Sequence, residues 1–454
     1  MRDTTFILSS DQLKELAQDV LRHARALGAS EAAVQISEGG GLSVSVRKGQ
    51  IETIEQNRDK GLGVTVYLGQ DRHTRRGNAS TSDFSQRSLK DTVEAAYNIA
   101  RFTAEDDCAG LADADALEMA PRDLKLCHPW AISVDEAVEL AKRGEAAAFA
   151  VDRRVTNSEG AGVHAQQSHF ISANSRGFMA GYPFSRHTLS VSPIAGRGAN
   201  MQRDGWYSSA RNAKHLAAPE LLGTYAAQRA LARLNARKLD TRKCPVLFEA
   251  PLAVGLLGTF VQAVSGGALY RKSSFLLDSI GTRVFPAHVQ VVEDPHVVGG
   301  VASAPFDDEG VRTAQRDVVK NGVVQGYFLS TYTARKLGMP STGNAGGSHN
   351  LVMRSTAGKR ADNFEAMLKK LHTGLLVTEL MGQGVNYVTG DYSRGASGFW
   401  VENGVIQYPV EEITIAGNMK QMLDQIVAIG TDTIVRGGKE TGSILIENMT
   451  VAGS

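Results

Sequence analysis

The first part of the chain changes from a helical to a strand period of apolar residues. Leucine, valine and alanine recur at helical spacing over residues 11–27 and stop at Gly28, which predicts an amphipathic helix. Alternation of apolar and polar residues then predicts four strands, with Lys48-Gly49 as a hairpin turn. These strands cover residues 32–37, 42–47, 51–54 and 63–67. A helix over about 86–102 follows. Strands in so close a run leave no room for helical crossovers, so the pattern favours an α+β layer.

The pattern then predicts further helices on either side of a β-rich stretch. Ser133 and Glu136 form a capping box that should start a helix running to about residue 150. Residues 154–210 alternate in short runs separated by glycine-rich turns and are predicted to form a β meander, followed by a helix over 219–237. The basic segment "RKLDTRKCP" (237–245) is the predicted border between two domains. Residues 1–240 would form an N-terminal sheet with helices, and residues 241–454 a β-rich domain with a largely antiparallel sheet.

The second half begins with an uncharged run and continues with hairpin signals. Residues 250–269 follow Glu249 without a charge, but a proline and four glycines dilute their hydropathy, so we expect a buried helix that breaks at Gly266 and Gly267 instead of a membrane span. Asn-Gly lies between apolar-rich runs in "VVKNGVVQGYF" (318–328) and "WVENGVIQYPV" (400–410), which predicts two β-hairpins. Residues 341–350 are predicted to form a glycine-rich loop, and 362–372 a short helix.

Composition narrows the class of protein. The 49 basic and 48 acidic residues give a net charge of +1, so neither nucleic acid nor an anionic membrane is an expected partner. Three widely spaced cysteines form neither a disulfide framework nor a CxxC metal motif. The amino terminus lacks the basic and apolar regions of an export signal. A cytoplasmic location is therefore expected.

The candidate chemistry of single motifs is weak. His164 and His169 are five residues apart in a predicted strand, which sends them to opposite faces and prevents a shared metal. The carboxylates of "FDDEG" (306–310) fit a turn better than general acid-base catalysis. Cys244 precedes a proline and an apolar run, which indicates a buried and inert thiol. Three arginines at helical spacing favour a solvated helix face over a phosphate site; they are Arg229, Arg233 and Arg237.

Several ordinary segments occur in an order that resembles one known family. They are "GLSVSVRKGQIETIEQNRDKGLGVTVYLG", "FDDEG" with "VVKNGVVQGYF", "TARKLGMPSTGNAGG", "GVNYVTGDYSRGASGFWVENGVIQYPVEEITIAGN" and "ILIENMTVAGS". In this order they resemble the TldD/PmbA family, also called modulators of DNA gyrase, over about the full length and in its PmbA (TldE) branch. The resemblance implies a two-domain α+β subunit of a cytoplasmic zinc peptidase, in which a TldD-type chain pairs with a PmbA-type chain.

The resemblance also locates the position of the family's zinc motif. The zinc-bearing partner uses HExxxH, in which two histidines bind the metal and the glutamate is the general base, with a cysteine near the C-terminus. In "FEAPLA" the corresponding positions hold Phe248, Glu249 and Ala253, and no cysteine follows Cys244. Because phenylalanine and alanine cannot coordinate zinc, we expect no metal on this chain and zinc in the TldD-type partner. Glu249 also suits a helix N-terminus without any chemistry.

The function implied is that of a non-metallated subunit in a heterodimeric zinc metalloprotease acting on unfolded peptides or small proteins. The glycine-rich loop supplies candidates for lining a peptide channel, namely Asn344, Gly346, Gly347 and His349. A homodimer is a further option when the partner is absent. Two alternatives stay open: a non-enzymatic binding or regulatory protein, and a metal-free hydrolase that uses Glu249 with Asp307 or Asp308.

Overall fold

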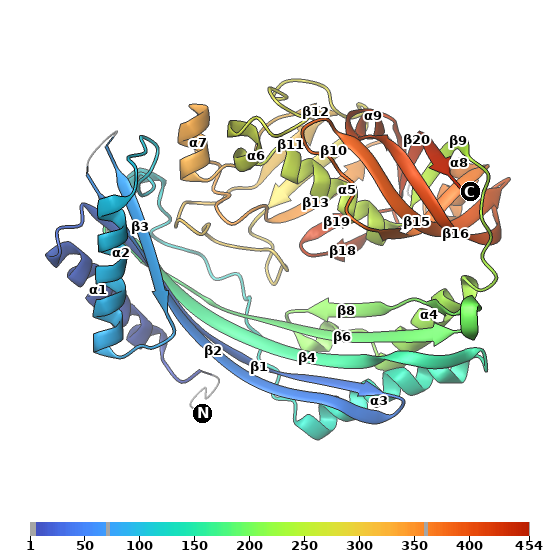
Figure 1. Cartoon of the computed structure of the whole chain (residues 1–454), viewed down its shortest axis with the longest axis horizontal. Helices are drawn as coiled ribbons and strands as arrows, with labels where there is room; N and C mark the ends of the chain where they lie inside the picture. The colour runs from blue at the N-terminus through green and yellow to red at the C-terminus, as the bar shows by residue number, and fades with distance from the viewer. Residues whose placement is uncertain (1–5, 70–72, 358–361, 454) are drawn as a thin grey trace. The chain divides into compact units, whose positions relative to one another are not determined.

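The computed structural model describes residues 6–69, 73–357 and 362–453 (Figure 1). It has two compact units. Unit 1 comprises residues 1–231, 298–300 and 305–313, and unit 2 comprises residues 232–297, 301–304 and 314–454. Each unit combines helices with largely antiparallel sheets, which confirms the predicted α+β class. The first continuous stretch of unit 1 ends at Leu231, before the predicted border. Unit 1 also includes two short segments from the second half of the sequence.

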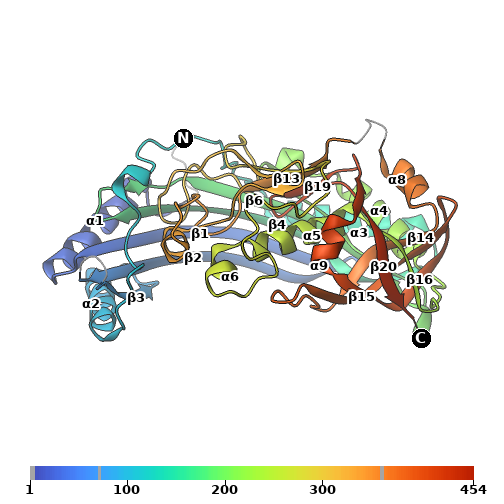
Figure 2. The same cartoon turned by 90° about the horizontal axis from the view of Figure 1, so that it is seen from above.

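Unit 1 is built on one eight-stranded antiparallel sheet with the strand order β3-β2-β1-β4-β6-β7, beside which β5 pairs with β4 and β8 with β6. The strands are β1 (Glu31–Arg47), β2 (Gln50–Leu68), β3 (Arg75–Thr81), β4 (Val155–Asn174), β5 (Met179–Ala180), β6 (Pro183–Ala195), β7 (Gln202–Arg203) and β8 (Trp206–Ala210). Figure 2 shows β1, β2, β4 and β6 side by side along their length. The predicted meander is therefore part of a larger sheet.

The four short strands predicted near the amino terminus are two long ones. The polar and glycine-rich stretches between them were taken as breaks, but Glu38 to Gly41 pair residue by residue with Lys60 to Asn57. Backbone pairing does not need apolar side chains, and polar residues are tolerated where a strand faces water. The turn at Lys48 and Gly49 is confirmed, with φ of 51° and 71°.

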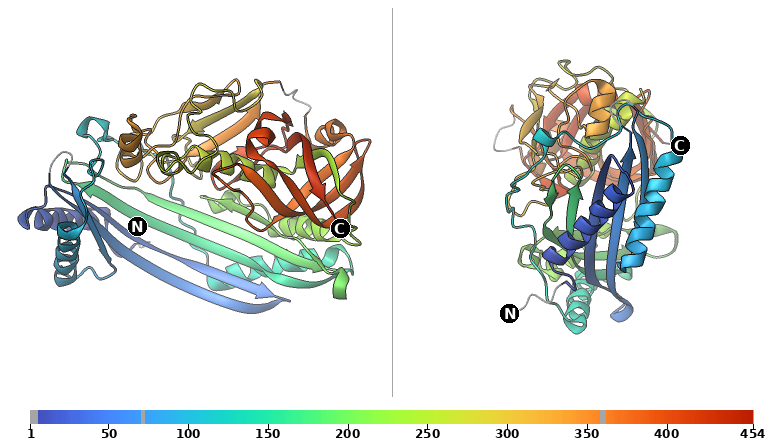
Figure 3. Two further views of the ribbon diagram at one scale, coloured as in Figure 1. Left: turned by 45° about the horizontal axis from the view of Figure 1, so that its top comes forward. Right: turned by 90° about the vertical axis from the view of Figure 1, so that its left-hand side faces the viewer.

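Four α-helices pack on the strands of this sheet, α1 (Ser10–Ala26), α2 (Gln86–Phe102), α3 (Val134–Val151) and α4 (Pro219–Ala232), with short 3-10 helices at Ala114–Ala116, Gly198–Asn200 and Ala213–His215. One apolar core joins α1 and α2 to β1 and β2, and a second joins α3 and α4 to β1, β4 and β6 (Figure 3). The helices predicted over 11–27 and 86–102 and the capping box at Ser133 are confirmed.

The prediction of a solvated arginine face was wrong. The helix ends at Ala232, so Arg233 and Arg237 lie beyond it. Arg229 lies 3.1 Å from a carboxylate oxygen of Asp204, and its guanidinium lies over the Trp206 ring. Arg233 is buried and forms an ion pair with Glu379, within unit 2. The burial of Arg233 is possible because it has a charged partner.

Unit 2 holds two six-stranded sheets, with the orders β12-β11-β10-β13-β19-β18 and β16-β15-β14-β9-β20-β17. An additional pairing of β16 with β20 closes part of the second sheet into a ring. The strands are β9 (Arg242–Phe248), β10 (Val289–Asp294), β11 (Arg316–Lys320), β12 (Val323–Val324), β13 (Asn350–Ser355), β14 (Gly374–Met381), β15 (Asp391–Glu402), β16 (Val405–Asn418), β17 (Ile426–Ile429), β18 (Ile434–Arg436), β19 (Lys439–Thr441) and β20 (Ile444–Ala452). Both Asn-Gly hairpins are confirmed.

The helices of unit 2 are α5 (Ala250–Ala263), α6 (Gly266–Tyr270), α7 (Thr331–Leu337), α8 (Phe364–Leu371) and α9 (Met419–Asp424). The uncharged run is a buried helix as predicted, but it breaks at Val264 and Ser265, and the two glycines begin α6. Gly266 donates its N–H to Phe328 O, and an added Cβ would lie 2.3 Å from Thr333 Oγ1, so this position requires glycine. No helix in the described part of the chain combines the length and apolarity needed to cross a bilayer.

Candidate functional site

The zinc-motif positions lie where β9 ends and α5 begins. Phe248 is the last residue of β9, Glu249 is the N-cap of α5, and Ala253 lies in the first turn of that helix. The motif thus spans a strand end and a helix start, and Glu249 lies at a helix N-terminus, as its sequence context suggested. The carbonyl of Glu249 accepts the N–H groups of Leu252 and Ala253, each at 2.9 Å. Its carboxylate therefore lies at the positive end of the helix macrodipole.

The donor set at these positions does not fit zinc. Phe248 and Ala253 are fully buried in the main apolar core of unit 2, where their side chains offer only carbon. Glu249 is partly exposed and is the one motif position with a ligand atom. Structural and catalytic zinc sites need three or four converging nitrogen, sulfur or oxygen donors. No catalytic step can be derived through a metal at this place.

Elsewhere in the described part of the chain, one group of three residues brings possible metal-ligating atoms within 4.8 Å of one another. It consists of the consecutive residues Asp106, Asp107 and Cys108 in unit 1. An Oδ1 atom of Asp106 accepts the N–H of Cys108 at 3.0 Å, as in an Asx turn. The group shares no residue with the positions predicted from the sequence.

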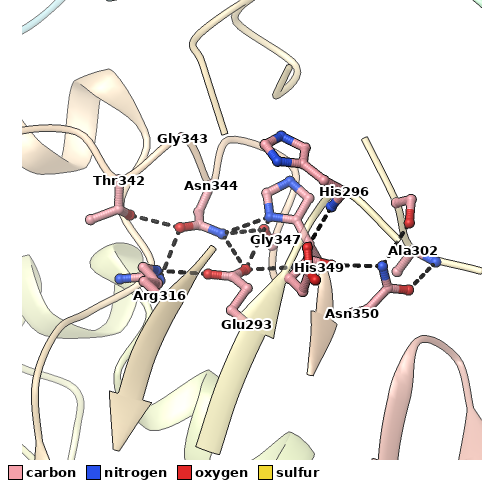
Figure 4. Close-up of polar contacts among 12 residues, drawn as sticks. Glu293, His296, Ala302, Arg316, Thr342, Gly343, Asn344, Gly347, His349 and Asn350 are labelled. Atoms are coloured by element: carbon pink, nitrogen blue, oxygen red, sulfur yellow. Dashed lines mark hydrogen bonds and ion pairs between the residues drawn. The ribbon is translucent and has the colours of Figure 1, made fainter. Parts of the chain in front are cut away.

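The glycine-rich loop brings two of its predicted residues together around a carboxylate that the sequence did not single out (Figure 4). Glu293, on β10, is 1% exposed and accepts four hydrogen bonds. Its Oε1 receives Asn344 Nδ2 at 2.8 Å, His349 N at 2.8 Å and His349 Nδ1 at 3.0 Å. Its Oε2 receives Arg316 Nε at 2.7 Å. Both oxygens are therefore occupied by protein groups.

Arg316 extends this network across the sheet and into the loop. It lies directly opposite Glu293 in the β10–β11 register and donates Nη1 to Tyr327 O at 2.8 Å. Its Nη2 donates to Asn344 Oδ1 at 3.1 Å, and the same oxygen receives Thr342 Oγ1 at 2.8 Å. The guanidinium also lies over the Phe328 ring, 5.0 Å from its centroid. The charges of Glu293 and Arg316 are thus paired with each other, and both side chains are hydrogen-bonded to further protein groups.

These contacts fix the protonation state of Glu293. Burial alone would raise the pKa of its carboxyl, but the hydrogen bond from His349 and the charge of Arg316 outweigh burial and lower the pKa to about 2. Because a carboxylate can only accept, the proton of His349 is assigned to Nδ1. Glu293 is ionised and saturated with donors, so it is neither a general base nor a free metal ligand. It holds the loop in place.

The loop has a fixed base and an exposed tip. Asn344 and His349 are buried, whereas Gly346 and Gly347 are exposed, with φ of 94° and 119°. Asn344 Nδ2 also donates to Gly347 O at 3.0 Å, which ties the tip to the base. Whether the four predicted residues line a peptide channel stays a prediction. The sequence could have indicated a buried Glu293, because it lies two and four residues after Val291 and Val289, which places all three side chains on the buried face of β10.

The other candidates occupy the places that the sequence predicted. Cys244 is buried, and burial raises the pKa of its thiol to about 11, so it is protonated and inert at neutral pH. His164 contacts Ser43 at 2.7 Å, whereas His169 is buried against Glu38 at 3.4 Å.

The turn at "FDDEG" is confirmed, because Asp307 Oδ1 accepts the N–H groups of Glu309 and Val311. Asp307 belongs to unit 1 and Glu249 to unit 2.

The fold and the motif positions define an α+β protein with a long antiparallel sheet in one unit, a ring-forming sheet in the other, and no zinc ligands where its sequence resembles a metal motif. Three family models match the chain: domain 1 (residues 32–100), the central domain (127–234) and the C-terminal domain (241–453) of the PmbA/TldA metallopeptidases. The chain belongs to the PmbA/TldD family.

Similar proteins agree with this assignment. Metalloprotease PmbA of Escherichia coli O157:H7 is 48% identical over 94% of each chain, and a PmbA homolog of Haemophilus influenzae is 45% identical over 98% of this chain and 96% of its own. A structure from Bacteroides thetaiotaomicron, named for a proposed role as a modulator of DNA gyrase, has a TM-score of 0.91 at 26% identity and covers 99% of this chain and 100% of its own. TldE from Thermococcus kodakarensis shares the fold at 21% identity, with a TM-score of 0.82 and coverage of 96% and 100%.

Proposed function

We propose that this chain is the PmbA (TldE)-type subunit of a two-chain zinc metallopeptidase in the cytoplasm. A TldD-type partner holds the zinc and the general base, and the complex cleaves unfolded peptides or small proteins. This chain stabilises the partner and helps to enclose the peptide, without supplying a ligand to the metal.

One observation carries the proposal. In a chain 48% identical to a protein named a metalloprotease, the positions that resemble the metal motif hold Phe248 and Ala253, both fully buried in the apolar core. Buried apolar side chains at these positions support a structural role for this chain and are consistent with chemistry on a second chain. Glu249 then acts through its position at the N-terminus of α5, where a negative charge is favourable.

The glycine-rich loop is the part of this chain that we assign to peptide contact. Gly346 and Gly347 are exposed and have no Cβ, so a peptide backbone can approach the loop closely. Asn344 and His349 hold the base of the loop against Glu293, which keeps the tip in one conformation. Substrates would be bound mainly by their backbone, as suits a peptidase with little sequence preference.

Co-expression with a TldD-type chain tests the proposal. We expect a stable complex with about one zinc per heterodimer, and cleavage of an unfolded peptide that a chelator abolishes. Metal analysis of this chain alone should find no stoichiometric zinc. Mutation of the partner's HExxxH glutamate to glutamine should abolish cleavage while the complex persists.

The matched control in this chain is Glu249→Gln, which should leave cleavage nearly unchanged because the glutamate is not the general base. Stoichiometric zinc in this chain alone would contradict the proposal, as would cleavage that survives mutation of the partner's motif. A complex that forms without any peptidase activity would favour the regulatory alternative, and loss of cleavage in Glu249→Gln would favour the metal-free hydrolase.

A further inference from the structure

Strand β2 has a long open edge in unit 1. Its inner edge pairs with β1 along the whole strand, whereas β3 covers its outer edge only from Leu62 to Leu68. Within the described residues, no strand or isolated bridge pairs with the outer edge over 50–61. Side chains 50–60 are exposed on both faces of the strand. Figure 3 (left) shows β2 as the outermost strand along this stretch.

An open edge of this length is a template for another strand. Its unpaired N–H and C=O groups lie in a row and can continue the sheet into a second chain. The stretch also exposes Ile51 (51%) and Ile54 (46%), which a paired strand would partly cover. The apolar cores under α1, α2 and α3 contain residues of β2 only from Leu62 onward, so none of these cores includes residues 50–61.

We propose that the open edge binds a second copy of this chain, β2 against β2, in antiparallel orientation. Two identical strands that pair in this way are related by a two-fold axis perpendicular to the sheet. Residues on one face then lie opposite residues on the same face. The register that uses the whole open edge places Ile51 opposite Gly61 and Gln56 opposite Gln56, and the pairing stops where β3 begins to cover β2.

The charges along the edge select the same register. Glu52 lies opposite Lys60 at two symmetric places, and Glu55 lies opposite Asn57. Opposite charges in directly facing positions stabilise a strand pair, and like charges destabilise it. A shift by one step in either direction brings Glu55 opposite either a second Glu55 or Asp59. Each neighbouring register therefore adds a like-charge contact that this register lacks, and the one that places Glu55 opposite a second Glu55 keeps a Glu52–Arg58 pair at two symmetric places.

This inference depends on the strand pairing of unit 1 and not on the proposed peptidase function. Either can fail while the other holds, because the dimer is measured on this chain alone, without zinc, partner or substrate. The zinc and cleavage experiments in turn need no dimer of this chain.

Sedimentation of purified single variants and of their mixture tests the contact. The wild-type chain should be a dimer, and Glu52→Lys and Lys60→Glu should each weaken dimerisation at least about tenfold, because each creates two like-charge contacts. An equimolar mixture of the two variants should restore a dimer, since it brings opposite charges together at both places. An effect within one chain cannot explain rescue by mixing. Glu447→Lys, at an exposed position of unit 2, is the control with the same charge change.

A cross-link tests the register. Gln56→Cys should give a disulfide-linked dimer under mild oxidation, because the residue lies on the two-fold axis. Thr53→Cys on the same exposed strand should not, and the wild-type chain controls for Cys108, Cys127 and Cys244. A chain that stays monomeric at about 100 µM, or a dimer that both charge reversals leave unchanged, would overturn the proposal. So would hydrogen-exchange protection of residues 51–61 that arises only when an extended peptide is added.

Discussion

At the scale of single residues, Glu293 determines whether the glycine-rich loop keeps its conformation. Glu293→Gln removes the charge that Arg316 and His349 face in a buried site and replaces one acceptor oxygen by a donor. Breaking a buried pair in this way typically costs about 3–5 kcal/mol of unfolding free energy. We expect denaturant unfolding to show a loss in this range. The exposed control Glu447→Gln should change the unfolding free energy by less than about 0.5 kcal/mol.

The pH dependence of stability gives an independent readout of the same residue. The pKa of Glu293 is lowered from 4.5 to about 2 by folding, so the stabilisation is complete above about pH 5 and is lost as the pH falls toward 2. The difference in unfolding free energy between the wild-type chain and Glu293→Gln should shrink by about 2 kcal/mol between pH 6 and pH 3. A difference that stays constant over this range would show that folding does not lower the pKa of Glu293.

At the scale of elements, the β1–β2 hairpin depends on a two-residue turn. Gly49 has φ of 71° with nothing near its Cβ position, so Gly49→Ala should cost about 1 kcal/mol through backbone strain alone. Gly61 also has open space at its Cβ position, and no left-handed φ is found there, so Gly61→Ala is the matched control and should be close to neutral. The carboxylate of Glu145 accepts the N–H groups of Lys48 and Gly49 and holds the turn on α3. Equal unfolding free energies for the two variants would contradict this account.

Short-range sequence signals predicted which helices and turns form. They did not predict the length of β1 and β2 or the contacts around Glu293. The hairpin turns, α1, α2 and the start of α3 follow from turn residues, apolar period and capping side chains, which act within a few residues. The length of β1 and β2 depends on long-range pairing, so polar residues that looked like breaks are continuous strand. Asn344 and His349 were predicted as loop residues that line a peptide channel, but their contact with Glu293 was not predicted, because Glu293 is about fifty positions away in the sequence and the fold alone brings them together.

At the scale of the whole molecule, unit 1 is not one continuous stretch of sequence. Residues 305–313 return to it, and Phe306 packs edge-to-face on Phe178 and Tyr182, with ring centroids 5.1 and 5.6 Å apart. A fragment of residues 1–240 lacks these groups and should expose Phe178, which is 1% accessible in the whole chain. We expect it to bind a hydrophobic dye and to exchange amide hydrogens faster over β5 and the start of β6, and a synthetic peptide of residues 304–314 to restore protection. In the whole chain, Phe306→Ala should cost about 3–4 kcal/mol of unfolding free energy. Unchanged protection in the isolated fragment would mean that residues 1–240 complete their core without the returning segment, and that the border after residue 240 is a true domain boundary.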